Sequence, residues 1–255
     1  MTRWALDLRA ALAILTRIPV DGRTGDRTGA GAYAIVGGLV GVAGLVPLVV
    51  LGPIVPPVAA ILAIAAIAAV SGAIHLDGLA DTADALLAVG PEGDERARKD
   101  PSVGVGGVVA LILVLAIDAS ALTIIATEVS PLAAGLMCLV AGAVSRSAPV
   151  VLGLAARSRT IGSGLGAWFV AGTTAKAGFW AGAATVVLSL VVAAVLGGPG
   201  ALIAVAGGGV SGLVLAAGLL RARGQLDGDL LGASVELSFA ASLVAAAVGR
   251  SWLTT

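Results

Sequence analysis

The most chemically suggestive part of this sequence is a run of carboxylates at the end of a long apolar stretch. Asp77, Asp81 and Asp84 follow His75 at helical spacings, so on a helix the three carboxylates project from one face. Like charges at this spacing repel one another and destabilise an isolated helix. A divalent cation such as Mg²⁺ relieves the repulsion, because hard cations bind carboxylate and phosphate oxygens. The pattern therefore favours metal or phosphate chemistry over the alternative, a turn at Asp77-Gly78 with Asp81 as a helix cap.

Further polar clusters carry residue types that bind phosphate. Arginines hold phosphate in a fork, carboxylates hold cations, and glycines let backbone N–H groups approach phosphate oxygens. Together these groups suit phosphoryl transfer, in which catalysis consists mainly of positioning and charge neutralisation. The clusters comprise Arg17; Arg96, Arg98, Lys99, Asp100 and Gly104; Ser145 and Arg146; and Gly228, Asp229 and Glu236.

The composition places this chemistry in a membrane protein. Of the 255 residues, 58% are hydrophobic and only 12% are charged, whereas soluble domains have about 25% charged residues. Basic and acidic residues balance at 15 each and form no basic stripe, which argues against nucleic acid as a partner. Cys138 is the only cysteine, so an internal disulfide and a thiolate metal site are excluded, and we interpret it as inert packing.

Seven apolar runs predict an all-α, polytopic transmembrane bundle that forms one domain over residues 1–255. The second run is short and is compatible with a re-entrant segment. We expect residues 1–28 to form an interfacial segment with an amphipathic helix, because charged residues interrupt its apolar ones. We expect residues 75–104 to form the main catalytic loop. The runs fall at about 30–51, 57–74, 105–126, 131–151, 177–197, 200–220 and 233–249.

The distribution of basic residues orients the predicted bundle. With seven spans, every lysine and arginine except Arg250 falls on one side, which the positive-inside rule makes cytoplasmic. We therefore expect the polar clusters to converge on the cytoplasmic face. Asp118 and Glu236 lie within apolar runs and must face the bundle interior, and we interpret Asp118 as a structural residue paired with Arg146.

The ordered motifs of the chain resemble those of the adenosylcobinamide-GDP ribazoletransferases, also called cobalamin 5′-phosphate synthases. The resemblance covers nearly the whole chain, through residues 16–20, 75–84, 98–107, 145–146 and 228–237. It implies a multi-pass enzyme of the prokaryotic inner membrane that joins α-ribazole, or its 5′-phosphate, to adenosylcobinamide-GDP. GMP is released and Mg²⁺ is required. The implied partners are these two substrates and the lipid bilayer, with a homo-oligomer left open.

For this reaction we assign Asp77, Asp81 and Asp229 as Mg²⁺ ligands and Asp84 as a ligand or as the base. His75 is a second candidate for the base. Asp227 stands where the family has threonine, so it is either an added ligand or the cap of a turn. Since the chain has only 3% aromatic residues, we expect an aliphatic corrin site. The substrate-binding candidates are Arg17, Arg96, Arg98, Lys99, Asp100, Gly104, Ser145, Arg146, Gly228 and Glu236.

Two other classes remain as alternatives. CDP-alcohol phosphatidyltransferases also align aspartates, but with an Asp-Gly-x-x-Ala-Arg start and a longer spacing to the second pair, which this chain lacks. A transporter would carry its charges at mid-depth in the membrane, whereas the expected clusters here lie at one face.

Overall fold

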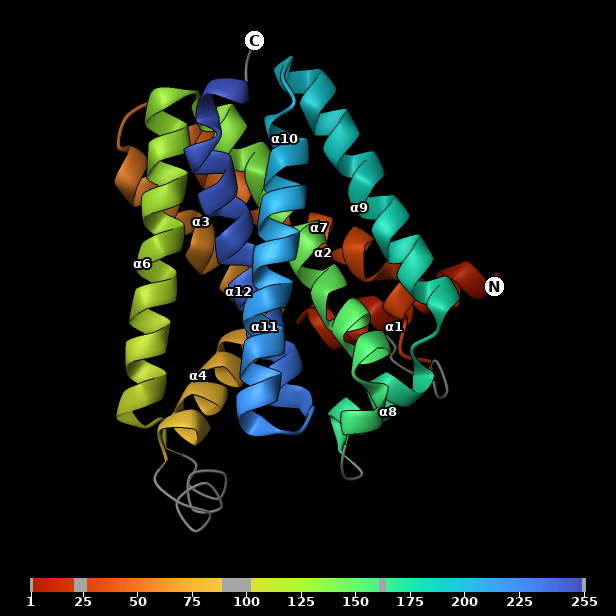
Figure 1. Cartoon of the computed structure of the whole chain (residues 1–255). Helices are drawn as coiled ribbons and strands as arrows, with labels where there is room; N and C mark the ends of the chain where they lie inside the picture. Colours follow the sequence, from red (N-terminus) through yellow and green to blue (C-terminus); the bar gives the residue numbers. More distant parts are fainter. Residues whose placement is uncertain (1, 21–26, 89–101, 161–163, 254–255) are drawn as a thin grey trace.

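The computed structural model describes residues 2–20, 27–88, 102–160 and 164–253, which form an all-α bundle without strands (Figure 1). This confirms the predicted fold class. The long helices are α2 (Tyr33–Leu51), α3 (Pro56–Ser71), α6 (Val105–Glu128), α7 (Pro131–Ala155), α9 (Ala175–Leu196), α11 (Gly209–Arg223) and α12 (Gly228–Val248). The shorter elements are α1 (Arg3–Leu15), α4 (Ile74–Leu87), α8 (Leu165–Gly172), α10 (Gly200–Ile203), the 3-10 turns η1 (Ala30–Ala32), η2 (Arg157–Arg159) and η4 (Arg250–Trp252), and the π-helical turn η3 (Ala204–Gly208).

Six helical segments of the described chain are long and apolar enough to cross a membrane, and they match six of the predicted runs. The last begins at Gly228, five residues before the predicted start, because the Asp227 side chain caps α12 by accepting a hydrogen bond from the Leu230 N–H at 3.0 Å. The remaining run forms α3, which is bent by 95° from α4. Seven spans are therefore reached only when this bent pair counts as one. The six segments are Ala30–Leu51, Val105–Glu128, Pro131–Ala155, Ala175–Leu196, Gly200–Arg223 and Gly228–Val248.

The bend between α3 and α4 is made by Gly72 and Ala73, which both have positive φ, 67° and 56°. For Ala73 this left-handed conformation costs about 1 kcal/mol. Gly72 is needed for a second reason, because a Cβ there would collide with the side chain of Arg17. The Arg17 N–H also donates to the Val70 carbonyl at 2.8 Å. The segment after α1 thus fastens the bend that turns α4 across the end of the bundle (Figure 1).

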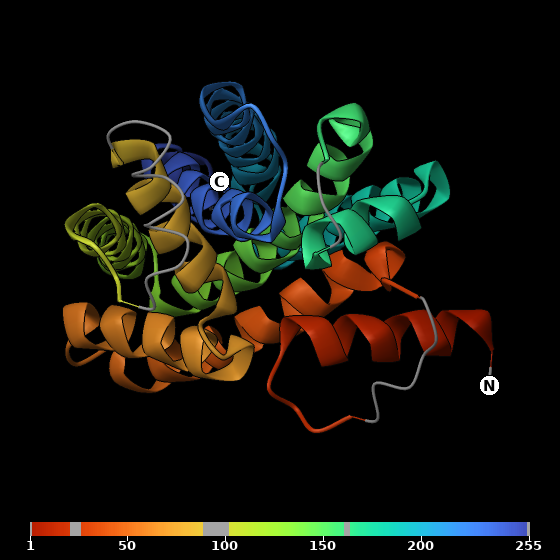
Figure 2. The same cartoon turned by 90° about the horizontal axis from the view of Figure 1, so that it is seen from below.

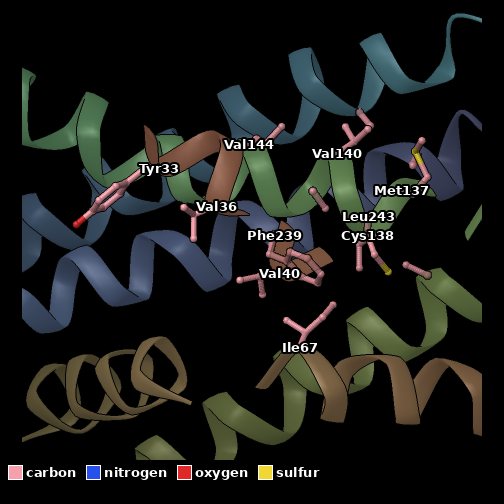
Figure 3. Close-up of a cluster of buried hydrophobic side chains, with 14 of the residues drawn as sticks. Tyr33, Val36, Val40, Ile67, Met137, Cys138, Val140, Val144, Phe239 and Leu243 are labelled. Carbon is pink, nitrogen blue, oxygen red and sulfur yellow. The ribbon is translucent and has the colours of Figure 1, made fainter. Parts of the chain in front are cut away.

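The centre of the bundle is the crossing of α2 and α7. Gly37 on α2 faces Gly142 on α7, and a Cβ on Gly37 would collide with the Gly142 carbonyl oxygen. Small residues at this crossing bring the two backbones together, as the glycine pattern predicts. Val40 and Cys138 pack in the same core, and Cys138 is fully buried (Figure 3).

The predicted N-terminal helix is present as α1 and runs crosswise to the spanning helices (Figure 2). Its buried side chains, Ala10, Ala11 and Leu15, face the bundle. Gly29 packs against its backbone, where a Cβ would lie 2.5 Å from the Asp7 carbonyl oxygen. The amphipathic character of α1 and its placement at a membrane interface stay predictions.

Candidate active site

A pocket of about 390 Å³ opens among α1, α2, α4, α7, α8 and α12, at the end of the bundle where α4 lies. Its wall is mostly apolar, and its polar members include His75, Asp77 and Asp229. Gly228 also lines it. The pocket therefore brings together four of the predicted site residues, from two motifs that are far apart in the sequence.

Close packing of α4 on α12 creates this meeting of carboxylates. A Cβ on Gly78 would lie 2.8 Å from the Asp229 carbonyl oxygen, and a Cβ on Gly232 would lie 3.3 Å from the Gly78 Cα. Because Gly78 follows Asp77 directly, this contact sets Asp77 beside the first turn of α12. The alternative of a turn at Asp77-Gly78 is wrong, since α4 is continuous from Ile74 to Leu87.

Arg223, which belongs to none of the predicted clusters, connects α11, α4 and α12. Its guanidinium pairs with the Asp227 carboxylate at 2.7 Å and donates to the Thr82 hydroxyl at 3.3 Å. The available signal was the Arg223/Asp227 spacing of four residues. Of the two roles left open for Asp227, the structure shows the cap, with its carboxylate also paired to Arg223.

Asp81 is exposed on α4 and experiences the charge of its neighbours. Partial burial raises the pKa of Asp81, and the negative charges of Asp77 and Asp84 raise it further, while Arg223 opposes them. The predicted repulsion along this helix is therefore present. A bound cation would relieve it.

Asp84 lies elsewhere, against the N-terminus of α6. Its two carboxylate oxygens accept hydrogen bonds from the N–H groups of Gly104, at 2.7 Å, and Gly107, at 2.8 Å. A carboxylate at this position satisfies unpaired N–H groups and interacts favourably with the helix dipole. The glycine segment that begins at Gly104 is predicted to donate its backbone N–H groups to phosphate. In this structure, two of these N–H groups donate to the Asp84 carboxylate. The roles of Asp84 as base or metal ligand stay predictions.

No three His, Cys, Asp or Glu side chains within the described ranges form a group that could hold a metal ion. Mg²⁺ commonly keeps several waters and binds through one or two carboxylates together with substrate phosphates. Asp77 and Asp229, which share one pocket, fit such a substrate-bridged ion. They do not form a complete protein cage.

His75 is only 6% exposed, and its Nδ1 has no hydrogen-bond partner. Burial lowers the pKa of His75 well below its usual value, and the positive charge of Arg146 lowers it further. The imidazole is therefore neutral at pH 7. It can accept or donate a hydrogen bond at the pocket wall.

Ser145 and Arg146 lie inside the bundle and do not line the pocket. Arg146 is 2% exposed, donates to the Ser145 hydroxyl at 2.9 Å, and has its Cζ 6.0 Å from the centre of the Phe239 ring. It lies nine residues before the end of α7, or about 13 Å along the helix. The expected convergence of all clusters on one face therefore fails for this pair.

Arg146, Asp118 and Glu236 line a second, much smaller cavity of about 20 Å³. This is room for about one water molecule. The ion pairs among the described residues include none between Arg146 and either carboxylate, so the predicted Asp118–Arg146 pair is wrong. One Asp118 oxygen and the Arg146 Nε have no partner at all. We call these three residues the buried charge cluster.

The other predicted binding residues are placed as follows. Arg17 is exposed at the bend between α3 and α4 and does not line the pocket. Arg96, Arg98, Lys99 and Asp100 lie outside the described residues.

Comparison with known proteins gives a consistent result. The sequence model of the family described as Cobalamin-5-phosphate synthase matches residues 7–247. The adenosylcobinamide-GDP ribazoletransferase of Pyrococcus abyssi is 33% identical over 178 residues, 68% of this chain and 69% of the relative. Those of Rhizobium johnstonii and Thermococcus kodakarensis are 35% and 32% identical, covering 57% and 69% of this chain and 59% and 71% of the relatives. No solved structure matches the chain.

Proposed function

Because the chain belongs to the cobalamin-5-phosphate synthase family, we infer that it is a membrane transferase that joins α-ribazole, or its 5′-phosphate, to adenosylcobinamide-GDP. The product is adenosylcobalamin or its 5′-phosphate, and GMP is released. The observation that carries this conclusion is the family match over residues 7–247, which includes every residue of the pocket. The apolar helices agree with an enzyme embedded in a membrane.

The reaction forms one P–O bond and breaks another. A ribose hydroxyl of ribazole attacks the phosphorus next to the cobinamide, and GMP leaves with the electron pair of the bond that breaks. Catalysis of such a transfer depends on holding the two reactants in line and on neutralising charge. His75 is neutral and lines the pocket, so its imidazole is suited to accept a hydrogen bond from the attacking hydroxyl.

We assign Asp77 and Asp229 as the residues that would hold Mg²⁺, with Asp81 as a third carboxylate nearby. When bound, the ion would neutralise the diphosphate of the donor. Asp84 acts mainly in this proposal by fixing α4 to the start of α6, through its hydrogen bonds to Gly104 and Gly107. The carboxylates of α4 are thereby held in place.

The pocket faces the cytoplasm in this proposal, and the membrane is the plasma membrane of a prokaryote. The support is the positive-inside distribution of lysine and arginine. Single cysteines at Leu87 and Leu165, which are 70% and 66% exposed, should resist an impermeant maleimide added to intact cells. A cysteine at Trp252, in the last turn before the C-terminus, should react, since the C-terminus lies at the opposite end of the bundle (Figure 1). Native Cys138 is fully buried and contributes little background, and labelling at Leu87 from outside would reverse the orientation.

The activity is tested with the purified protein in lipid vesicles. Adenosylcobinamide-GDP and α-ribazole are supplied with Mg²⁺, and GMP and the corrinoid product are separated by chromatography. We expect stoichiometric GMP and adenosylcobalamin, no product when a chelator removes Mg²⁺, and recovery when Mg²⁺ is restored. Absence of product with both α-ribazole and its 5′-phosphate would refute the proposed function.

A further inference from the structure

The pocket that holds Asp77 and Asp229 is small for the donor of this reaction. Its volume of about 390 Å³ lies near the lower limit of ligand pockets, which span about 300–1,000 Å³. Adenosylcobinamide-GDP joins a corrin ring to two nucleosides, and as a whole it is too large to fit inside, so only its diphosphate has to reach Asp77 and Asp229. Ribazole is a single nucleoside with a flat, bicyclic aromatic base. By size, the pocket fits the acceptor.

Aromatic side chains gather in this pocket although the chain has few of them. Of eight aromatic residues in the sequence, three line the pocket: Tyr33, Trp168 and Phe169. Four of the others are exposed at the surface, namely Trp4, Phe179, Trp180 and Trp252. The low aromatic content that predicts an aliphatic corrin site therefore does not describe this pocket.

The aromatic wall is firmly supported. Tyr33 and Phe169 are buried and stack with their ring centroids 5.3 Å apart, which fastens α8 to the start of α2. Trp168, next along α8, is only half-buried and lines the pocket. Earlier along α8, a Cβ on Gly166 would lie 2.7 Å from the backbone N of Gly228. The helix that carries Trp168 is therefore held close to the turn that carries Asp229.

We propose that this pocket is the acceptor subsite, in which the base of ribazole stacks on Trp168 and the ribose extends toward Asp77 and Asp229. The proposal rests on the proposed function and adds to it the residue that recognises the base. Aromatic faces bind flat bases by stacking without requiring hydrogen bonds. The apolar wall, which includes Leu15 and Val235, suits a base with little polarity. A more polar purine base would leave donors and acceptors unpaired in it.

The kinetic test compares Trp168→Ala with Trp168→Phe and with the control Trp180→Ala, whose indole is exposed on α9. Since stacking contributes substantially per base, Trp168→Ala should raise the KM for α-ribazole about tenfold or more. The KM for adenosylcobinamide-GDP should stay within about twofold of the wild-type value, because the substitution removes no contact to the donor. Trp168→Phe should recover most of the affinity for α-ribazole, and Trp180→Ala should match the wild type.

A binding measurement gives a second readout that needs no turnover. Replacing Trp4, Trp180 and Trp252 by phenylalanine leaves Trp168 as the only tryptophan. Titration with α-ribazole should quench its fluorescence saturably, and adenosine should quench it more weakly. If the wild type makes no cobalamin product, the proposed function fails. If the wild type is active but Trp168→Ala leaves the KM for α-ribazole unchanged, or raises only that for the donor, the acceptor subsite is refuted.

Discussion

The carboxylates of α4 and those of the buried charge cluster differ in their surroundings. Asp77 and Asp81 are exposed at the end of the bundle, and the pKa of Asp81 is raised by partial burial and by its acidic neighbours. Asp118 and Glu236 are inside the bundle and share a cavity with Arg146. Water screens the repulsion on α4, whereas a charge of one sign inside the bundle would be far more costly.

This difference separates two reasons for a charged residue in an apolar chain. A like-charged group open to water, beside a pocket, can accept a cation and substrate phosphates. A buried group of mixed sign instead balances charge between helices, since Arg146, Asp118 and Glu236 come from α7, α6 and α12 and line one small cavity. We therefore expect changes on α4 and the start of α12 to affect turnover, and changes in the buried charge cluster to affect folding.

The largest expected effect tests the buried side of this comparison. Arg146→Met removes the only positive charge facing Asp118 and Glu236 among the residues of that cavity. An uncompensated buried charge typically costs about 3–5 kcal/mol of stability. Unfolding in mixed detergent should show a loss of this size, and the triple variant with Asp118→Asn and Glu236→Gln should recover much of it. Wild-type stability in Arg146→Met would mean that Arg146 does not balance the charges of this cluster.

Asp229→Ala tests the exposed side. Loss of a charge-neutralising contact should lower kcat by about a hundredfold or more, which is roughly 2.7 kcal/mol of barrier. The melting temperature should hold, because Asp227 is the residue that caps α12. The matched control is Asp227→Thr, which keeps a capping oxygen and should retain activity within about tenfold. An inactive Thr variant beside an active Asp229→Ala would reverse the assignment.

Asp84→Ala distinguishes capping from chemistry. Loss of both hydrogen bonds to the start of α6 should lower the free energy of unfolding by about 1 kcal/mol. Activity should fall much less than in Asp229→Ala, with Asp84→Asn intermediate in stability because one acceptor oxygen remains. A large loss of activity at unchanged stability would instead identify Asp84 as the base or a metal ligand.

The smallest effect concerns Asp81→Asn without Mg²⁺. The pKa of Asp81 is higher in the folded protein than in the unfolded chain, so folding disfavours the charged carboxylate. The free energy of unfolding of the wild type therefore increases as the pH falls through the raised pKa. Removing the repulsion should stabilise the protein at pH 7 by about 0.2–0.5 kcal/mol. The gain should disappear at acidic pH, where wild-type Asp81 is protonated. A destabilised Asn variant at pH 7 would show that Asp81 has a structural partner.

Local patterns in the sequence predict the spans well, because apolar length is a property of each segment alone. They also predict that the carboxylates of α4 share a helix. They misplace Arg146, since the predicted apolar run ends at residue 151 while α7 continues to Ala155. The meeting of Asp84 with Gly104, and of Trp168 with the pocket, depends on contacts between distant segments. No periodicity within either segment indicates such contacts.

The bend at Gly72 also bears on the membrane around the enzyme. α3 has 16 residues and so reaches about 24 Å, less than the hydrocarbon core of about 30 Å. If α3 is embedded as a separate membrane segment, the lipids beside it would meet a hydrophobic mismatch, which a bilayer accommodates by thinning locally. The thinned region would adjoin the start of α4, where His75 and Asp77 lie. Tail length of the surrounding lipids is therefore a property that we expect this enzyme to sense, with shorter tails matching α3 more closely.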